Sequence, residues 1–204
     1  MLGSDLVAGL DARLLEAVGG LRSGPLTTAM TLLSAWWMKG LVIAGLGTVA
    51  DLRRSPNRLP WTPPLAGAAL LAAALLSAAL KDLVGRVRPS LADPTLTALI
   101  AVPSDPSFPS GHATSAFAAA GVVAALHPRL RTPALVLATL IALSRVYLGV
   151  HFASDILAGA ALGLSISVVV VAVGRRLGAP PVRQPFTRTR IAARMRAWRA
   201  TAPT

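Results

Sequence analysis

The chain has 204 residues, of which 54% are hydrophobic, and its mean hydropathy is +0.63. This composition excludes an ordinary soluble domain and predicts one integral membrane protein. The formal net charge is +12, but the 20 Lys and Arg lie mostly in short loops between apolar segments and after Gly174, so we expect no nucleic-acid partner. Cysteine is absent, which excludes disulfides and thiolate metal sites.

The chain opens with residues 1–24, in which charged residues alternate with leucines. This stretch lacks the basic-then-apolar layout of a cleaved signal peptide. We expect a short amphipathic helix that lies on the membrane surface. The charged residues are Asp5, Asp11, Arg13, Glu16 and Arg22.

Residues 25–174 form the predicted membrane domain, because they contain apolar segments that approach the roughly 20 residues a spanning helix needs. The pattern predicts an all-α fold, a polytopic membrane helical bundle with five to six transmembrane helices, the sixth being the N-terminal helix. The five apolar segments are Leu26–Ala50, Leu65–Leu80 with its continuation toward Gly85, Gly111–Leu126, Pro133–Val150 and Phe152–Gly174.

The first apolar segment carries a lysine, Lys39, directly after Trp36, Trp37 and Met38. In one interpretation, which we favour, the helix is continuous and Lys39 extends to the membrane interface beside the tryptophans. In the other, the first helix is broken or re-entrant.

The connecting segments predict which side of the membrane each end occupies. Asp51–Pro64 reads as a proline-rich loop, His127–Thr132 as a basic turn, and Ser90–Phe108 as an ordered loop or lid. Residues 175–204 contain eight arginines and four prolines, and we expect a basic, disordered tail. If five segments cross, the two basic connections and the tail share one side, which the positive-inside rule makes the cytoplasm of a plasma-membrane protein. The basic residues of the connections are Arg53, Arg54, Arg58, Arg129 and Arg131.

The opposite, extracytoplasmic side then receives three polar stretches, Lys81–Pro89, Pro109–His112 and Ser144–Asp155. Phosphoryl transfer needs cations around the non-bridging oxygens, a nucleophile and an acid for the leaving group. We expect Lys81, Arg88 and Arg145 to supply the cations. Further phosphate ligands that we expect are the Ser110 hydroxyl and the Gly111 N–H, which lies at a helix N-terminus.

His151 and Asp155 are four residues apart, so on a helix the carboxylate would share a face with the imidazole and orient it as a nucleophile. His112 is then free to protonate the leaving group. Each residue alone has an ordinary structural interpretation, as a helix cap or an interfacial anchor. Their joint occurrence on one side favours the phosphate site. Gly159 and Gly163 indicate close helix packing within the bundle.

These residues resemble the type 2 phosphatidic acid phosphatase superfamily, which shares its core site with bacterial acid phosphatases and vanadium haloperoxidases. Its signature is Lys, six residues, Arg-Pro; then Pro-Ser-Gly-His; then Ser-Arg, five residues, His, three residues, Asp. All three parts are intact here, and the recognisable region is about Leu65–Gly174.

The resemblance implies hydrolysis of a lipid phosphate ester or anhydride through a phosphohistidine on His151, with Asp155 orienting it and His112 as the acid. It implies no metal and no cofactor. We expect undecaprenyl or another polyprenyl diphosphate as the substrate, converted to the monophosphate at the outer face. Phosphatidic acid, phosphatidylglycerol phosphate, diacylglycerol diphosphate and a prenyl-phosphoribose phosphate are alternatives, and a haloperoxidase or a non-enzymatic membrane protein is more remote.

Overall fold

The computed structural model describes residues 2–54 and 60–179, and within these ranges every regular element is a helix. The all-α prediction is confirmed. The α-helices are α1 (Leu2–Gly19), α2 (Gly24–Leu33), α3 (Leu41–Arg54), α4 (Thr62–Val84), α5 (Pro89–Ala92), α6 (Gly111–Leu126), α7 (Arg131–Tyr147) and α8 (Ala153–Arg176). Two short 3-10 turns are η1 (Trp36–Met38) and η2 (Pro128–Leu130).

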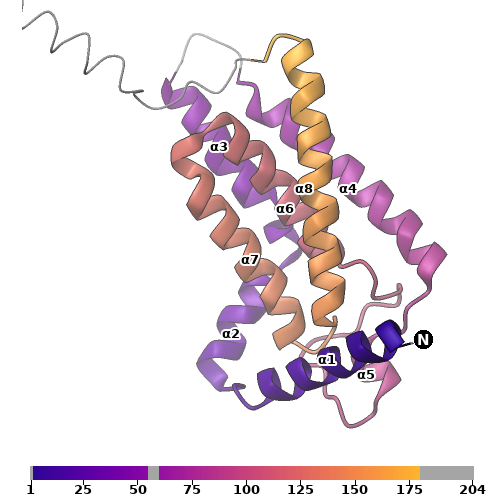
Figure 1. Ribbon diagram of the computed structural model, residues 1–204. Coiled ribbons are helices and arrows are strands. Elements are labelled where there is room, and N and C mark those ends of the chain that lie inside the picture. The colour runs from indigo at the N-terminus through magenta and orange to yellow at the C-terminus, as the bar shows by residue number, and fades with distance from the viewer. Residues whose placement is uncertain (1, 55–59, 180–204) are drawn as a thin grey trace, which may run out of the picture.

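Helix α6 is the centre of the bundle and packs against α8, α7, α4 and α3 (Figure 1). Its sequence is rich in Ala and Gly, and small side chains let neighbouring helix backbones approach closely. A Cβ at Gly159 of α8 would lie 2.7 Å from the Ser110 carbonyl oxygen, and one at Gly163 would meet the Thr114 carbonyl. The two glycines therefore pack α8 onto α6 within the bundle, as the sequence predicts.

Three helical stretches are long and apolar enough to cross a membrane by length and composition: Thr62–Ala92, Pro128–Tyr147 and Ala153–Arg176. Their outward faces carry large exposed apolar side chains, such as Leu71 and Val168. Such a surface suits lipid rather than water. Helix α6 is apolar but has only 16 residues. The number of crossings, five to six, stays a prediction.

The first apolar segment is broken, so the continuous helix that we favoured for Leu26–Ala50 is wrong and the alternative is correct. Helix α2 ends at Leu33 and α3 begins at Leu41, with η1 between them. The break ends at Gly40, whose φ of 123° is a backbone conformation that favours glycine. A Cβ there would also lie 2.9 Å from the Ser115 carbonyl oxygen. Lys39 is exposed beside it.

The other predicted segments agree with the observed helices to within a few residues. Helix α4 continues to Val84, as expected, and ends at Gly85, whose φ is 62°. Helix α6 has the predicted bounds, α7 begins and ends two to three residues earlier than predicted, and α8 extends to Arg176. Arg58 and residues 180–204 of the predicted tail lie outside the described residues.

The two ends of the bundle differ in their polar contacts. At one end His127 Nε2 lies 3.0 Å from Thr62 Oγ1 and 3.2 Å from Asp51 Oδ1, which joins the ends of α3, α4 and α6. At the opposite end α1 lies across the bundle beneath the helices, in contact with α7 and α8 (Figure 1). Residues 1–24 thus contain the predicted helix, with Leu6 and Leu10 exposed on it. Its place on a membrane surface stays a prediction.

Candidate active site

The three signature stretches meet at one end of the bundle. They come from the C-terminal end of α4 with the loop after it, the N-terminal end of α6, and the α7–α8 connection (Figure 1). Gly149, in that connection, has a φ of 74°, and a Cβ there would lie 2.8 Å from the Thr97 carbonyl oxygen. This turn therefore packs tightly on the loop that follows α5 and fixes the start of the His151 segment.

His151 and Asp155 lie together, but not on the face of one helix as the spacing suggested. Helix α8 begins at Ala153, so His151 precedes it and Asp155 is in its first turn. His151 Nδ1 lies 3.4 Å from Asp155 Oδ2, and the same oxygen accepts a hydrogen bond from the Phe152 N–H at 2.9 Å. Asp155 therefore caps α8 and orients the imidazole at the same time.

Arg88 determines which nitrogen of His151 carries the lone pair. Its NH1 group lies 3.2 Å from His151 Nε2 and donates to the Val150 carbonyl at 2.8 Å. A guanidinium only donates, so Nε2 carries the lone pair and Nδ1 carries the proton toward Asp155. Burial lowers the pKa of His151 to about 4, although the hydrogen bond that Nδ1 donates to Asp155 acts in the opposite direction. The imidazole is therefore neutral at neutral pH, with a free lone pair on Nε2.

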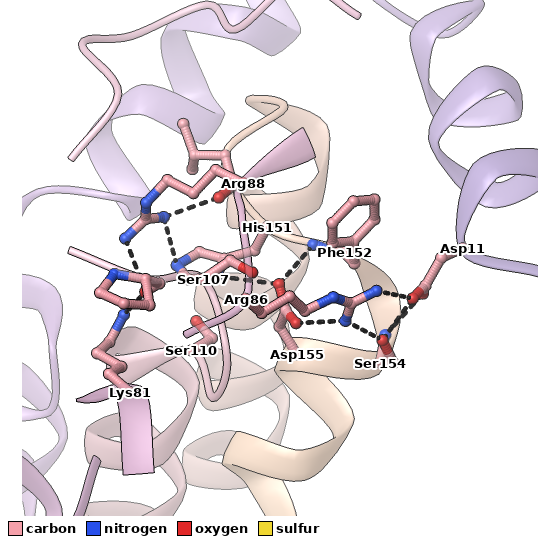
Figure 2. Close-up of polar contacts among 12 residues, drawn as sticks. Asp11, Lys81, Arg86, Arg88, Ser107, Ser110, His151, Phe152, Ser154 and Asp155 are labelled. Atoms are coloured by element: carbon pink, nitrogen blue, oxygen red, sulfur yellow. Dashed lines mark hydrogen bonds and ion pairs between the residues drawn. The ribbon is translucent and has the colours of Figure 1, made fainter. Parts of the chain in front are cut away.

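Lys81 and Arg88 lie on either side of one carboxylate (Figure 2 shows both cations). Asp105 Oδ2 is 3.0 Å from Lys81 Nζ, and Asp105 Oδ1 is 2.7 Å from Arg88 NH2. Burial alone would raise the pKa of Asp105, but the hydrogen bonds and charges of Lys81 and Arg88 hold it below its ordinary value. The half-exposed carboxylate thus links the two cations across the loop.

Ser110 and Gly111 stand at the N-terminus of α6, as predicted. Ser110 is the N-cap residue and its N–H donates to the Asp155 carbonyl at 3.1 Å. Its hydroxyl is buried and has no partner in the described part of the chain. Gly111 has open space on its side-chain face, where the nearest atom to a Cβ would be Ser77 Oγ at 3.8 Å. A donor and a helix N-terminus are therefore available to an anion.

His112 and Arg145 both contact Ser34, the residue that follows α2. His112 Nε2 lies 3.0 Å from the Ser34 carbonyl oxygen, and Arg145 NH1 donates to the Ser34 hydroxyl. The Arg145 Nε–H is buried and finds no partner among the described residues. The break in the first segment thus supplies the group that holds these two side chains.

A family model supports this assignment: the PAP2 superfamily model matches residues 65–178. The chain belongs to the PAP2 superfamily. Two relatives are named decaprenylphosphoryl-5-phosphoribose phosphatase. The one from Mycobacterium tuberculosis is 40% identical over 66% of this chain and 71% of its own length, and the one from Mycolicibacterium smegmatis is 37% identical over 76% and 84%. The transmembrane PAP2-type phosphatidylglycerolphosphate phosphatase of Bacillus subtilis has the same fold, with a TM-score of 0.68 and 28% identity over 84% of this chain and 87% of that one.

This PAP2 protein is therefore a membrane hydrolase that removes phosphate from a lipid, in a family that needs no metal ion. The sequence-based recognition of the superfamily and of the enzyme class is confirmed.

Some residues of the PAP2 site were missed in the sequence. Arg86, which lies within the Lys81–Pro89 stretch but was assigned no role there, contacts Asp155. Ser34, Asp105 and Asp11 gave no motif, since they lie outside the signature. The one available signal was a carboxylate or a basic group placed among apolar residues.

Proposed function

We propose that this protein removes the terminal phosphate of a polyprenyl-linked phosphoribose, a phosphomonoester on a long isoprenoid lipid. The observation that supports this substrate is the extent of the similarity to the two mycobacterial relatives. They match over 71% and 84% of their own lengths, whereas the Bacillus subtilis phosphatidylglycerophosphatase B matches over 50%. The undecaprenyl diphosphate that we expected from the sequence shares the isoprenoid chain but presents an anhydride, and it is the second substrate to test.

In this proposal the phosphate is bound noncovalently, by three positive charges and by neutral hydrogen-bond donors. Lys81 acts as a point charge, while Arg88 and Arg145 each offer a planar fork to two oxygens. The Ser110 hydroxyl, which has no partner among residues 2–54 and 60–179, and the N-terminus of α6 at Gly111 add neutral donors. Such pre-placed donors stabilise the extra charge on the oxygens in the transition state.

The nucleophile in the proposal is His151 Nε2. As the Nε2–P bond forms, the bond from phosphorus to the leaving oxygen breaks, and that oxygen takes a proton from His112. Asp155, on Nδ1, stabilises the positive charge of the phosphorylated imidazole. Water then attacks the phosphohistidine, releases inorganic phosphate and returns a proton to His112. Because His112 Nε2 contacts the Ser34 carbonyl, Nδ1 is the nitrogen that exchanges the proton.

We further propose that the site faces the outside of the plasma membrane. The end of the bundle opposite the site carries the basic residues that flank the helices, and basic flanks favour the cytoplasm. They are Arg53 and Arg54 of α3, Arg129 and Arg131 before and at the start of α7, and Arg175 and Arg176 of α8. Residues 175–204 would then be cytoplasmic, and the bundle would cross five or six times.

The test is release of inorganic phosphate by the purified protein in detergent, with EDTA present throughout. Three substrates are compared at equal mole fraction: decaprenylphosphoryl-5-phosphoribose, undecaprenyl diphosphate and phosphatidic acid. A kcat/KM at least tenfold higher for the phosphoribose lipid supports the proposal. Preference for the diphosphate would support the expectation from the sequence, and preference for phosphatidic acid would refute an isoprenoid substrate.

A further inference from the structure

Helix α1 brings a buried carboxylate to the active site. Asp11 is only 2% exposed, although its neighbours Ala12 and Arg13 are exposed. Asp11 Oδ1 accepts a hydrogen bond from the Ser154 N–H at 2.9 Å, and Oδ2 accepts from the Ser154 hydroxyl and, at 2.8 Å, from Arg86 NH2 (Figure 2). A segment outside the family signature thus contacts the first turn of α8.

Arg86 connects this carboxylate to the catalytic pair. Its NH2 group binds Asp11, while NH1 donates to Asp155 Oδ1 at 2.6 Å and to Ser154 Oγ at 2.7 Å. The guanidinium lies 4.0 Å above the centre of the Phe152 ring, which limits its freedom to move. Figure 2 shows the resulting chain of contacts from Asp11 through Arg86 to Asp155.

The charges of this chain decide what it does to His151. Arg86 alone would neutralise Asp155, the carboxylate that has to stabilise positive charge on the phosphorylated imidazole. With Asp11 on its other side, Arg86 is shared between two carboxylates, and the group of three keeps a net charge of −1. The buried position of Asp155 makes this difference count, because charges interact strongly where water is excluded.

We infer that Asp11 is a positioning residue for the nucleophile, acting through Arg86 and Asp155 on His151. Helix α1 is then part of the catalytic assembly rather than only a membrane-surface helix. This inference rests on the proposed function, since it gives Asp11 a part in the same phosphoryl transfer.

A purely structural role for Asp11, as the tether of α1, is the competing explanation. The contacts of α1 argue against it, because the helix has other attachments. Leu15 is buried in an apolar cluster that includes Val146 and Ile156. Arg22, just after α1, donates to the Tyr147 carbonyl at 3.2 Å. Removing one charge from Asp11 should therefore leave α1 in place.

The sign of the expected pH effect follows from the groups that face His151. Asp155 of α8 favours its protonated form, while Arg88 from the loop after α4 and Arg145 of α7 disfavour it. His112 of α6, the proposed general acid, carries its proton in the proposed resting state and also disfavours protonation of His151. Removing the negative charge of Asp11 leaves Arg86 uncompensated, so His151 should titrate at a lower pH in Asp11→Asn.

The experiment compares Asp11→Asn with Glu16→Gln, which removes the same charge from an exposed position of the same helix. For each variant, kcat and KM are measured on the lipid that the wild-type protein hydrolyses fastest. The titration of His151 is followed by NMR with 15N-labelled histidine, assigned from the signals that His151→Gln lacks. We expect kcat of Asp11→Asn to fall about tenfold with KM within twofold, and the His151 midpoint to move to lower pH.

The double variant Asp11→Asn/Arg86→Gln keeps the inference testable if Asp11→Asn folds poorly. Removing the cation as well returns the net charge beside His151 to −1, so the titration midpoint should move back toward that of the wild type. A structural tether predicts the opposite, since the double variant loses more contacts. The charge-conserving Asp11→Glu should recover most of kcat.

The inference is overturned if kcat and the His151 midpoint of Asp11→Asn equal those of Glu16→Gln. That result is distinct from failure of the proposed function, in which the wild-type protein releases no phosphate from any of the three lipids. The NMR titration tests the charge coupling even then.

Discussion

Arg88→Lys keeps the positive charge of the phosphate site and removes its geometry. The guanidinium of Arg88 is almost completely buried and makes four short contacts: Nε to the Asp105 carbonyl at 2.9 Å, NH1 to the Val150 carbonyl and to His151, and NH2 to the Asp105 carboxylate at 2.7 Å. A lysine ammonium has three donors at one point and cannot span these partners.

The loss can be estimated from the contacts. A hydrogen bond to a charged partner contributes about 1.5–3 kcal/mol and a neutral one about 1 kcal/mol. Losing one of each from the transition state costs about 3 kcal/mol, which corresponds to a fall in kcat/KM on the order of 100-fold. Arg13→Lys, an exposed position on α1, is the control and should change nothing.

The assay is phosphate release together with inhibition by vanadate, an anion that occupies the same cations. We expect Arg88→Lys to lose both activity and vanadate affinity, while circular dichroism shows the helix content of the wild type. A variant that keeps kcat/KM within threefold and binds vanadate normally would refute the argument that the planar fork of Arg88 holds the phosphate.

Three further predictions concern the nucleophile, the loop carboxylate and the packing of α8. His151→Gln should lose turnover without unfolding. In the wild type, kcat/KM should fall on lowering the pH only near about pH 4, because the lowered pKa keeps the His151 imidazole neutral below pH 6.5. A fall on the acid side that is centred at pH 6.5 would contradict this. The pKa of Asp105 is lower in the folded than in the unfolded protein, so its contribution to folding stability is present above about pH 3.8 and is lost as pH falls further. The thermal unfolding midpoints of Asp105→Asn and the wild type should therefore differ at pH 7 and converge at low pH. Gly159→Ala should destabilise the protein by about 1–3 kcal/mol, because the added Cβ meets the Ser110 carbonyl. The control Gly67→Ala adds a Cβ in open space and should be neutral or stabilising. Equal unfolding midpoints of the two variants in a denaturant series would disprove this.

The helices that depend on local sequence could be predicted well. Helix α6 begins at the residue after Ser110 and ends at Leu126, as its apolar pattern indicates, and α4 ends where Gly85 allows a positive φ. The break at Ser34–Gly40 was not favoured, because its cause is not local. Gly40 fits a backbone that lies against α6, near the Ser115 carbonyl, and this neighbour is not evident in the sequence around Gly40.

The residues of the candidate site also divide into those that the local sequence predicts and those that it does not. The signature residues lie after the end of α4, at the start of α6, and in the connection between α7 and α8. Because successive long helices run antiparallel, these three places meet at one end of the bundle. The contact between His151 and Asp155 was predicted for the wrong reason. The spacing of four suggested one helix face, but the two residues lie on either side of the start of α8, where Asp155 Oδ2 also accepts a hydrogen bond from the Phe152 N–H. A cap and a catalytic contact use the same oxygen, which spacing alone does not distinguish.

Supporting residues such as Ser34 and Asp11 are harder to predict for a physical reason. Ser34 acts through its backbone carbonyl and its hydroxyl, and Asp11 through its carboxylate, and neither residue belongs to a recognisable motif. What distinguishes them is an unusual environment: Asp11 is buried in a helix that exposes large apolar side chains such as Leu6 and Leu10, and Ser34 lies where a helix stops among apolar residues. A charge or a break in such surroundings is costly unless partners compensate it, so each implies a partner elsewhere in the chain. For Asp11 that partner is Arg86, which belongs to the Lys81–Pro89 stretch on the predicted extracytoplasmic side, where the positive-inside rule makes a basic residue least expected. Taken together, the carboxylate of Asp11 and the basic side chain of Arg86 suggest an ion pair between α1 and the signature loop. That ion pair would bring α1 into contact with the active site.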